Sequence, residues 1–212
     1  VKALIADSTR PGIGRGTVLT PLERNIDSAG YHYRHVEVSI DRAARTATLT
    51  VSGPTLPQPT DVDLIHAAGA RWWPLAVARE LDDAILMLRT NDLDIGLWIL
   101  KTRGDIDAML AVDATLQSHH TDWLVRETVG LLRRALARLD VSSRTLFAVI
   151  DERSCFAGTL LELALAADRS YMLLLPEDDP QAPRIALSGM NFGAYPMVNH
   201  QTRIATRFCG EK

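Results

Sequence analysis

A strand, a tight turn and a helix follow one another between Thr145 and Leu175, and this stretch constrains the fold most strongly. The run from Thr145 to Ile150 has the β-branched and aromatic content of a short strand, and the polar turn Asp151–Ser154 ends it. An apolar helix is predicted from about Thr159, and Tyr171–Leu175 is predicted to be a second, buried strand. This order of elements predicts parallel strands in one sheet.

The residues just before this helix have almost no side chain. Ala157 and Gly158 would let a bound group approach the backbone N–H groups at the start of the helix. The turn therefore leaves room for an anion or an oxyanion.

A β-hairpin is predicted in the first third of the chain. Apolar and polar residues alternate along His35–Ile40 and again along Thr46–Ser52, and the polar segment Asp41–Arg45 separates the two runs. This pattern predicts two antiparallel strands with one buried face.

Helices and strands alternate after the hairpin. Arg71–Arg89 has its apolar residues on one helical stripe, and Ile95–Leu100 is a continuous apolar run typical of a strand covered on both faces. Asp113–Asp140 is predicted to be largely helical, with a break or bend at His119-His120. The alternation predicts an α/β fold in which crossovers join parallel strands.

Length and composition predict one globular domain with extensions. The 212 residues are 47% hydrophobic and 23% charged, which is enough for a substantial core. Pro and Gly residues predict a linker or extension over residues 1–33, and the chain starts without Met, so we expect a preceding segment. Residues 34–200 form the predicted domain, and residues 201–212 begin a C-terminal helical segment.

Charge and composition argue against several classes of partner. A net charge of −3 argues against a nucleic-acid surface. The chain has no signal peptide and no apolar run of about 18 residues, so we expect no membrane contact and a reducing cytoplasm as its location. His32 and His35 have no third ligand nearby, so no metal is expected.

The segment Gly158–Met172 resembles the enoyl-CoA hydratase/isomerase (crotonase) family. Its Glu162-Leu163-Ala164 and Asp168 match the family's pattern, whereas only Gly158 remains of three glycines in the preceding turn. The resemblance implies a crotonase-like spiral of β-β-α units, of which this chain is a divergent copy.

The resemblance also implies roles for individual residues. Glu162 matches one of two carboxylates that move protons beside a thioester. Backbone N–H groups of Val112 (or Ala111), Gly158 and Thr159 would bind the enolate oxygen. The alternative is structural, because Thr159-Leu160-Leu161-Glu162 has the spacing of a capping box.

The second family glutamate is missing. Arg184 stands in its place, and an arginine cannot act as a base at neutral pH because its pKa exceeds about 12. This departure predicts a copy that keeps the fold and has lost the two-glutamate machinery.

Cys155 precedes the predicted helix. The helix dipole would lower the pKa of its thiol and make it a candidate base or nucleophile, and the alternative is a small buried side chain in a tight turn.

A narrower resemblance covers nearly the whole chain. Five segments resemble the C-terminal half of the benzoyl-CoA-dihydrodiol lyase family: Ala70–Asn91, Gly96–Thr102, Val141–Ile150, Arg153–Leu175 and Asn191–Phe208. The family opens the ring of 2,3-dihydro-2,3-dihydroxybenzoyl-CoA hydrolytically, giving 3,4-dehydroadipyl-CoA semialdehyde and formate. The resemblance implies a reaction without oxygen or a metal, and no separate cofactor, since the substrate carries CoA.

The resemblance further implies a division of labour in a carbon–carbon lyase. The N-terminal crotonase half would hold the catalytic glutamates, and this half would act as a scaffold and as a partner in a homodimer, inactive alone. Two alternatives remain: a catalytically dead interaction domain that binds no CoA, and a simple enoyl-CoA hydratase or isomerase that relies on Glu162 alone.

Overall fold

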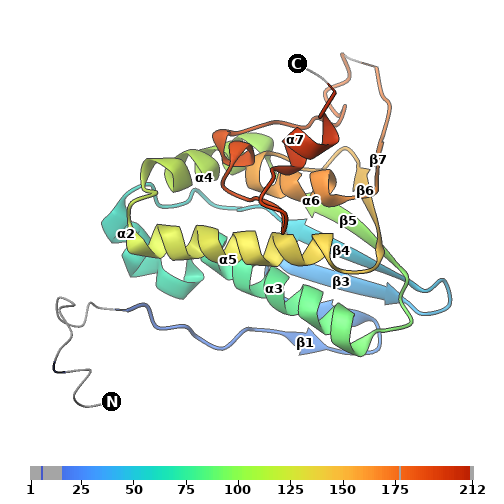
Figure 1. Ribbon diagram of the computed structural model, residues 1–212, viewed down its shortest axis with the longest axis horizontal. Coiled ribbons are helices and arrows are strands. Elements are labelled where there is room, and N and C mark those ends of the chain that lie inside the picture. Colours follow the sequence, from blue (N-terminus) through green and yellow to red (C-terminus); the bar gives the residue numbers. More distant parts are fainter. Residues whose placement is uncertain (1–5, 7–15, 177, 211–212) are drawn as a thin grey trace.

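A seven-stranded sheet forms the centre of the computed structural model, which describes residues 6, 16–176 and 178–210. The strands follow one another across the sheet in chain order (Figure 1). They are antiparallel from β1 to β4 and parallel from β4 to β7. Their bounds are β1 Asn25–Ile26, β2 Gly30–His32, β3 Val36–Asp41, β4 Thr46–Ser52, β5 Leu97–Arg103, β6 Thr145–Ile150 and β7 Arg169–Met172.

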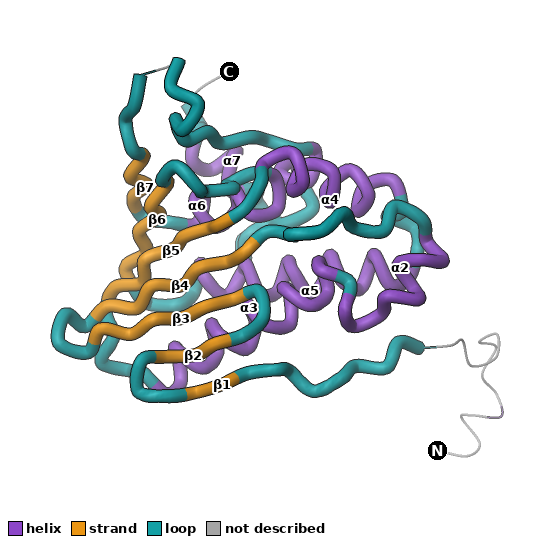
Figure 2. The backbone as a smooth tube through the Cα atoms, turned by 180° about the vertical axis from the view of Figure 1, so that it is seen from behind, coloured by secondary structure: helices purple, strands orange, loops and turns teal. Residues whose placement is uncertain are grey.

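Helices join the parallel strands to one another, and in Figure 2 some of them lie behind the sheet and others beyond the ends of its strands. Their bounds are α2 Val62–Ala68, α3 Trp73–Asn91, α4 Ile106–Ser118, α5 Trp123–Asp140, α6 Leu161–Ala166 and α7 Arg203–Arg207, with short 3₁₀ helices η1 Gly69–Arg71, η2 Gly158–Leu160 and η3 Gly189–Phe192. The predicted α/β class with parallel strands joined by helical crossovers is confirmed. The unit β3-β4-α3 has the β-β-α order, and the units after it have single strands.

The predicted hairpin is confirmed, because β3 and β4 pair antiparallel with Val38 opposite Leu49. Val36, Val38 and Ile40 are buried, and the residues between them are exposed. The period-two alternation in the sequence thus marks the face that packs on the helices.

Strand β5 is buried on one face only, so the expectation for Ile95–Leu100 of two covered faces is wrong. Trp98 and Leu100 are buried, whereas Leu97 and Ile99 are half-buried. Figure 2 shows this outer face of the sheet with no helix in front of it. An apolar run therefore did not distinguish a strand packed on one face from a strand packed on both.

The last strand also differs from the expectation. β7 covers Arg169–Met172 instead of Tyr171–Leu175, and all four residues are exposed, not buried. β7 pairs only with β6 because it lies at the edge of the sheet. Its apolar residues consequently lie on the surface of this chain.

The predicted break in the helical region is confirmed at His119. Helix α4 begins earlier than expected, at Ile106, because the Asp105 side chain caps it by accepting the Ala108 N–H at 2.8 Å. Asp122 caps α5 in the same way, accepting the Leu124 N–H at 2.9 Å.

The described part of the predicted linker region, residues 1–33, contains two strands. Residues 1–5 and 7–15 lie outside the described part of the chain, but β1 and β2 fall between Asn25 and His32 and extend the sheet. In the described part of the chain, no helix has the length and apolar character needed to span a bilayer.

Candidate functional site

The turn after β6 is held by charged groups. Asp151 follows the last residue of β6 and accepts hydrogen bonds from Arg103 Nη2 at 2.8 Å and Lys101 Nζ at 2.8 Å, both from β5. Burial alone would raise the pKa of the Asp151 carboxyl, but its bonds to Arg103, Lys101 and Ser154 outweigh burial and lower the pKa below its usual range. Asp151 is therefore ionised at neutral pH and fixes the direction in which the chain leaves the sheet.

Glu162 lies on α6 and is 1% exposed. Its Oε1 accepts a hydrogen bond from Asn191 Nδ2 at 2.7 Å, and its Oε2 accepts one from Arg203 Nη1 at 2.9 Å. Burial raises the pKa of Glu162, and the bonds from Asn191 and Arg203 oppose this rise. Both carboxylate oxygens thus have donors from the protein itself.

Arg203, which is 2% exposed, reaches Glu162 from the short helix α7. Its Nη2 donates to Asp140 Oδ2 at 2.9 Å and to the Leu136 carbonyl at 3.1 Å, and its Nη1 also donates to the Tyr195 carbonyl at 3.2 Å. One guanidinium therefore ties α7 to α5 and α6, and a buried charge of this kind needs such a complete set of partners.

The capping box predicted for Thr159 and Glu162 is not formed. The N-cap residues of η2 and α6, Ala157 and Leu160, make no side-chain capping hydrogen bond. The Thr159 hydroxyl instead donates to Asp113 Oδ1 at 2.5 Å. Glu162 instead forms an ion pair with Arg203, which links distant segments of the chain.

Asp113 occupies the place that was predicted for an anion. It is 0% exposed and extends from α4 to the start of η2, where its Oδ2 accepts the Thr159 N–H at 2.8 Å. Ser188 also donates to Asp113 Oδ2, at 2.5 Å. The Thr159 N–H group is therefore already hydrogen-bonded. It is not the free donor to an oxyanion that the sequence predicted.

Gly158 and Val112 are not free donors either. The Gly158 N–H donates to the Ala186 carbonyl at 2.9 Å. Val112 lies in the middle of α4, where a backbone N–H bonds to the carbonyl four residues earlier. The three groups predicted to bind an oxyanion therefore do not converge on an open space.

Cys155 is buried, at 0% exposure, and its N–H donates to Thr102 Oγ1 at 2.9 Å. Burial raises the pKa of its thiol, and the hydrogen bonds around it only partly oppose this. The expected lowering by the helix dipole is wrong, because the helix after Cys155 is short and the thiol is away from solvent. The alternative of a small buried side chain is the correct one.

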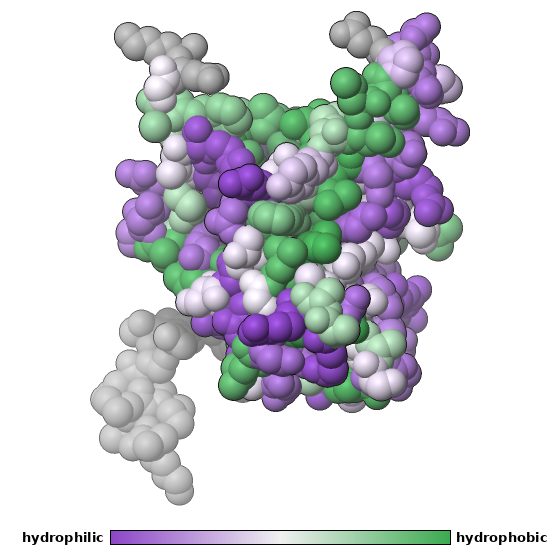
Figure 3. All heavy atoms as spheres, turned by 90° about the vertical axis from the view of Figure 1, so that its right-hand side faces the viewer, coloured by the Kyte–Doolittle hydropathy of each residue, from purple (hydrophilic) through white to green (hydrophobic). Residues whose placement is uncertain are grey.

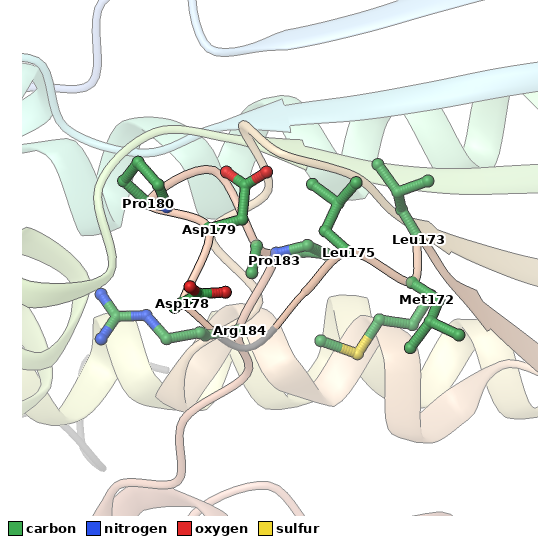
Figure 4. Close-up of a pocket in the computed structure, with 10 residues that line it drawn as sticks. Met172, Leu173, Leu175, Asp178, Asp179, Pro180, Pro183 and Arg184 are labelled. Atoms are coloured by element: carbon green, nitrogen blue, oxygen red, sulfur yellow. The ribbon is translucent and has the colours of Figure 1, made fainter.

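The Arg184 side chain is exposed, on the loop after β7 (Figure 4). The loop and the end of β7 enclose a pocket of about 640 Å³, whose lining combines Met172 and Leu173 with Asp178, Asp179 and Arg184. Glu162 is not among the described residues that line this pocket. The arginine and the glutamate thus belong to different environments.

Most hydrogen-bond partners of Glu162 and Asp113 were not predicted from the sequence. Ser188 and Asn191 form a reciprocal cap on η3, and their spacing of three residues was a local signal that could have been found. No local signal marked Arg203, because its carboxylate partners Glu162 and Asp140 are 41 and 63 residues away in sequence. In the described segments, no three His, Cys, Asp or Glu side chains come together as metal ligands would.

Comparison with known proteins gives one strong similarity. No family model matches the chain. The chain is 55% identical, over all of its 212 residues, to the benzoyl-CoA-dihydrodiol lyase of Aromatoleum evansii, and it spans 38% of the length of that relative.

Two solved structures illustrate the similarities in shape. An enoyl-CoA hydratase from Bacillus halodurans is 18% identical with a TM-score of 0.41, covering 64% of this chain and 49% of its own. An enoyl-CoA hydratase from Bacillus anthracis is 14% identical with a TM-score of 0.40, covering 65% of this chain and 46% of its own.

Proposed function

We propose that this chain is the C-terminal part of a benzoyl-CoA-dihydrodiol lyase and that it acts there as a crotonase-like scaffold. The identity of 55% along the whole chain to a lyase of that name supports the proposal. The longer protein would open the ring of 2,3-dihydro-2,3-dihydroxybenzoyl-CoA with water, giving 3,4-dehydroadipyl-CoA semialdehyde and formate. CoA would enter as part of the substrate, with no separate cofactor.

The observation that carries the scaffold role is the closed ion pair of Glu162. A general base must reach the proton that it abstracts, and in this chain the Glu162 carboxylate is 1% exposed and bonded to Asn191 and Arg203. The proton transfers of the lyase would then be carried out by the N-terminal crotonase half, which is the part of the longer protein beyond this chain.

The outer face of the sheet is where we propose that this N-terminal half packs. Parallel strands are almost always covered on both faces, yet here Leu97, Ile99 and Phe147 lie half-buried on a face without a helix (Figure 2). The relative is much longer than this chain, which covers 38% of it, so the additional protein is large enough to cover such a face.

A second surface supports the proposed homodimer. Tyr171, Met172 and Leu174 are exposed at β7 and just after it, and Leu174 is 92% exposed. In Figure 3, which views the side on which β7 lies in Figure 1, hydrophobic residues reach the surface between polar ones. The open edge of β7 can pair with the same edge of a second copy.

We also propose a cytoplasmic location. Cys155 and Cys209 are both free, which agrees with a reducing compartment.

Release of formate from 2,3-dihydro-2,3-dihydroxybenzoyl-CoA tests the proposal. The protein that contains this chain together with an N-terminal crotonase half is expected to release formate. The 212-residue chain alone is expected to release none and to hydrate no crotonyl-CoA. Crotonyl-CoA hydration by the chain alone that Glu162→Gln abolishes would favour the simple hydratase instead.

A further inference from the structure

The Asp113 carboxylate lies in a set of donors that would suit a free carboxylate ion equally well. Three groups donate to it: the Thr159 N–H at 2.8 Å, the Thr159 hydroxyl at 2.5 Å and the Ser188 hydroxyl at 2.5 Å. Tyr195, which is 2% exposed, lies behind this set, with its hydroxyl 3.0 Å from Thr159 Oγ1. Because the Thr159 hydroxyl donates to Asp113, the Tyr195 hydroxyl donates to Thr159.

The donors and the carboxylate come from separate elements. Asp113 lies on α4, Thr159 in η2 and Ser188 at the start of η3. The donors therefore hold one another in place through η2 and η3, and α4 only supplies the group that fills the space between them. Asn191 adds to this arrangement, since its amide donates to the Gly158 carbonyl at 2.9 Å and accepts the Ser188 N–H at 3.0 Å.

Gly158 shows that the backbone is shaped around the anion. It has a φ of +48°, and a Cβ atom there would lie 1.8 Å from Asp113 Oδ2 and 2.8 Å from Ser188 Oγ. The carboxylate thus occupies the space that any side chain at position 158 would need.

We infer that this is a carboxylate-binding site whose ligand is the side chain of Asp113. Truncation of Asp113 opens a buried space with two hydroxyl donors and one backbone N–H donor, which binds a small carboxylate ion of matching size. The inference rests on this geometry and does not depend on the lyase reaction.

Carboxylate ions of two sizes can test this inference in variants that leave spaces of two sizes. Asp113→Ala removes one carboxylate and keeps Cβ, so formate fills the space; Asp113→Gly removes Cβ as well, so acetate fills it better. At ten times its dissociation constant, the ligand stabilises the folded chain by about 1.4 kcal/mol, which raises the melting temperature by roughly 3–6 °C. The measurement is thermal unfolding of the full chain, with sodium formate, sodium acetate or sodium chloride at equal ionic strength.

Two control variants separate this effect from general stabilisation by salt. Leu116→Ala opens an apolar cavity at a buried residue of the same helix, and formate should stabilise it no more than chloride does. Asp113→Ala combined with Ser188→Ala removes a donor and should lose most of the response. If Asp113→Ala is unfolded without ligand, recovery of its folded circular dichroism signal by formate replaces the melting temperature.

Equal effects of formate and chloride on Asp113→Ala would overturn the inference, as would failure of formate to restore an unfolded variant. The same formate response in Leu116→Ala would overturn it as well.

Discussion

Arg203 Nη1 lies 2.9 Å from Glu162 Oε2, and the two residues are 2% and 1% exposed. The pair joins the helix that carries the family's first glutamate to the last helix of the chain. The carboxylate in this setting is bound to a permanent cation and to the Asn191 amide. Both of its oxygens therefore accept hydrogen bonds from the protein itself.

Glu162→Gln should lower the free energy of unfolding by about 3 kcal/mol, because it leaves one side of a buried guanidinium without its charge partner. Urea denaturation at neutral pH measures the loss. Glu127→Gln is the matched control, since the side chain of Glu127 is 63% exposed, and it should change stability by no more than about 0.5 kcal/mol. If Glu162→Gln lowered the free energy of unfolding by as little as the control does, the ion pair would not stabilise the fold as predicted.

A double-mutant cycle should show that Glu162 and Arg203 act on each other. Arg203→Met leaves Glu162 and Asp140 without their common cation, so it should cost about 3–5 kcal/mol. The cost of Glu162→Gln in the Arg203→Met background should be smaller than in the wild type by at least about 1 kcal/mol. Strict additivity of the two losses, measured by urea denaturation, would mean that the contact contributes no stability.

Gly158→Ala should destabilise the chain by about 2 kcal/mol or more. The new Cβ would lie 1.8 Å from Asp113 Oδ2, and the φ of +48° is unfavourable for alanine. In an Asp113→Ala background the clash with the carboxylate disappears, whereas the close approach to Ser188 Oγ and the positive φ remain, so the added cost of Gly158→Ala should decrease but not vanish. Gly16→Ala is the control, because nothing lies within 4 Å of a Cβ at that position. Equal melting temperatures for Gly158→Ala and Gly16→Ala would be inconsistent with the packing described.

Asp151 should contribute to stability only above the acid range. Its pKa is lowered in the folded chain, so its contribution is complete above the unfolded value of about 4 and is lost as the pH falls through the folded value. The side chain is 21% exposed, so we expect Asp151→Asn to cost only about 1–2 kcal/mol at pH 7. Urea denaturation at several pH values should show the difference between variant and wild type shrinking below about pH 4. A difference that stays constant down to pH 3 would refute this role.

The sequence predicted the elements whose pattern is local. The alternation in β3 and β4 identified a hairpin and its buried face, and the β-branched run Thr145–Ile150 matched β6 at both ends. Composition could not show that β7 lies at the edge of the sheet. The exposure of its residues depends on whether another strand pairs beyond it. A run of apolar residues looks the same at an edge and at the centre of a sheet.

The candidate site could be predicted only in part. The small residues at Ala157 and Gly158 indicated room for an anion, and the structure fills that room with Asp113. Asp113 is 46 residues away from Thr159 in sequence, so spacing alone could not reveal the contact. The same holds for Arg203 and Glu162, which are 41 residues apart. Loss of glycines and of the second glutamate indicated a changed site, but not which side chains lie there.

The most direct measurement is the rate of formate release by the longer protein that contains this chain, compared between wild type and Glu162→Gln at a temperature where both are folded. A scaffold role predicts rates within about two-fold of each other per folded molecule, together with a lower melting temperature for the variant. A loss of about 10²-fold or more with an unchanged melting temperature is the size expected for a general acid or base, and that result would contradict the account.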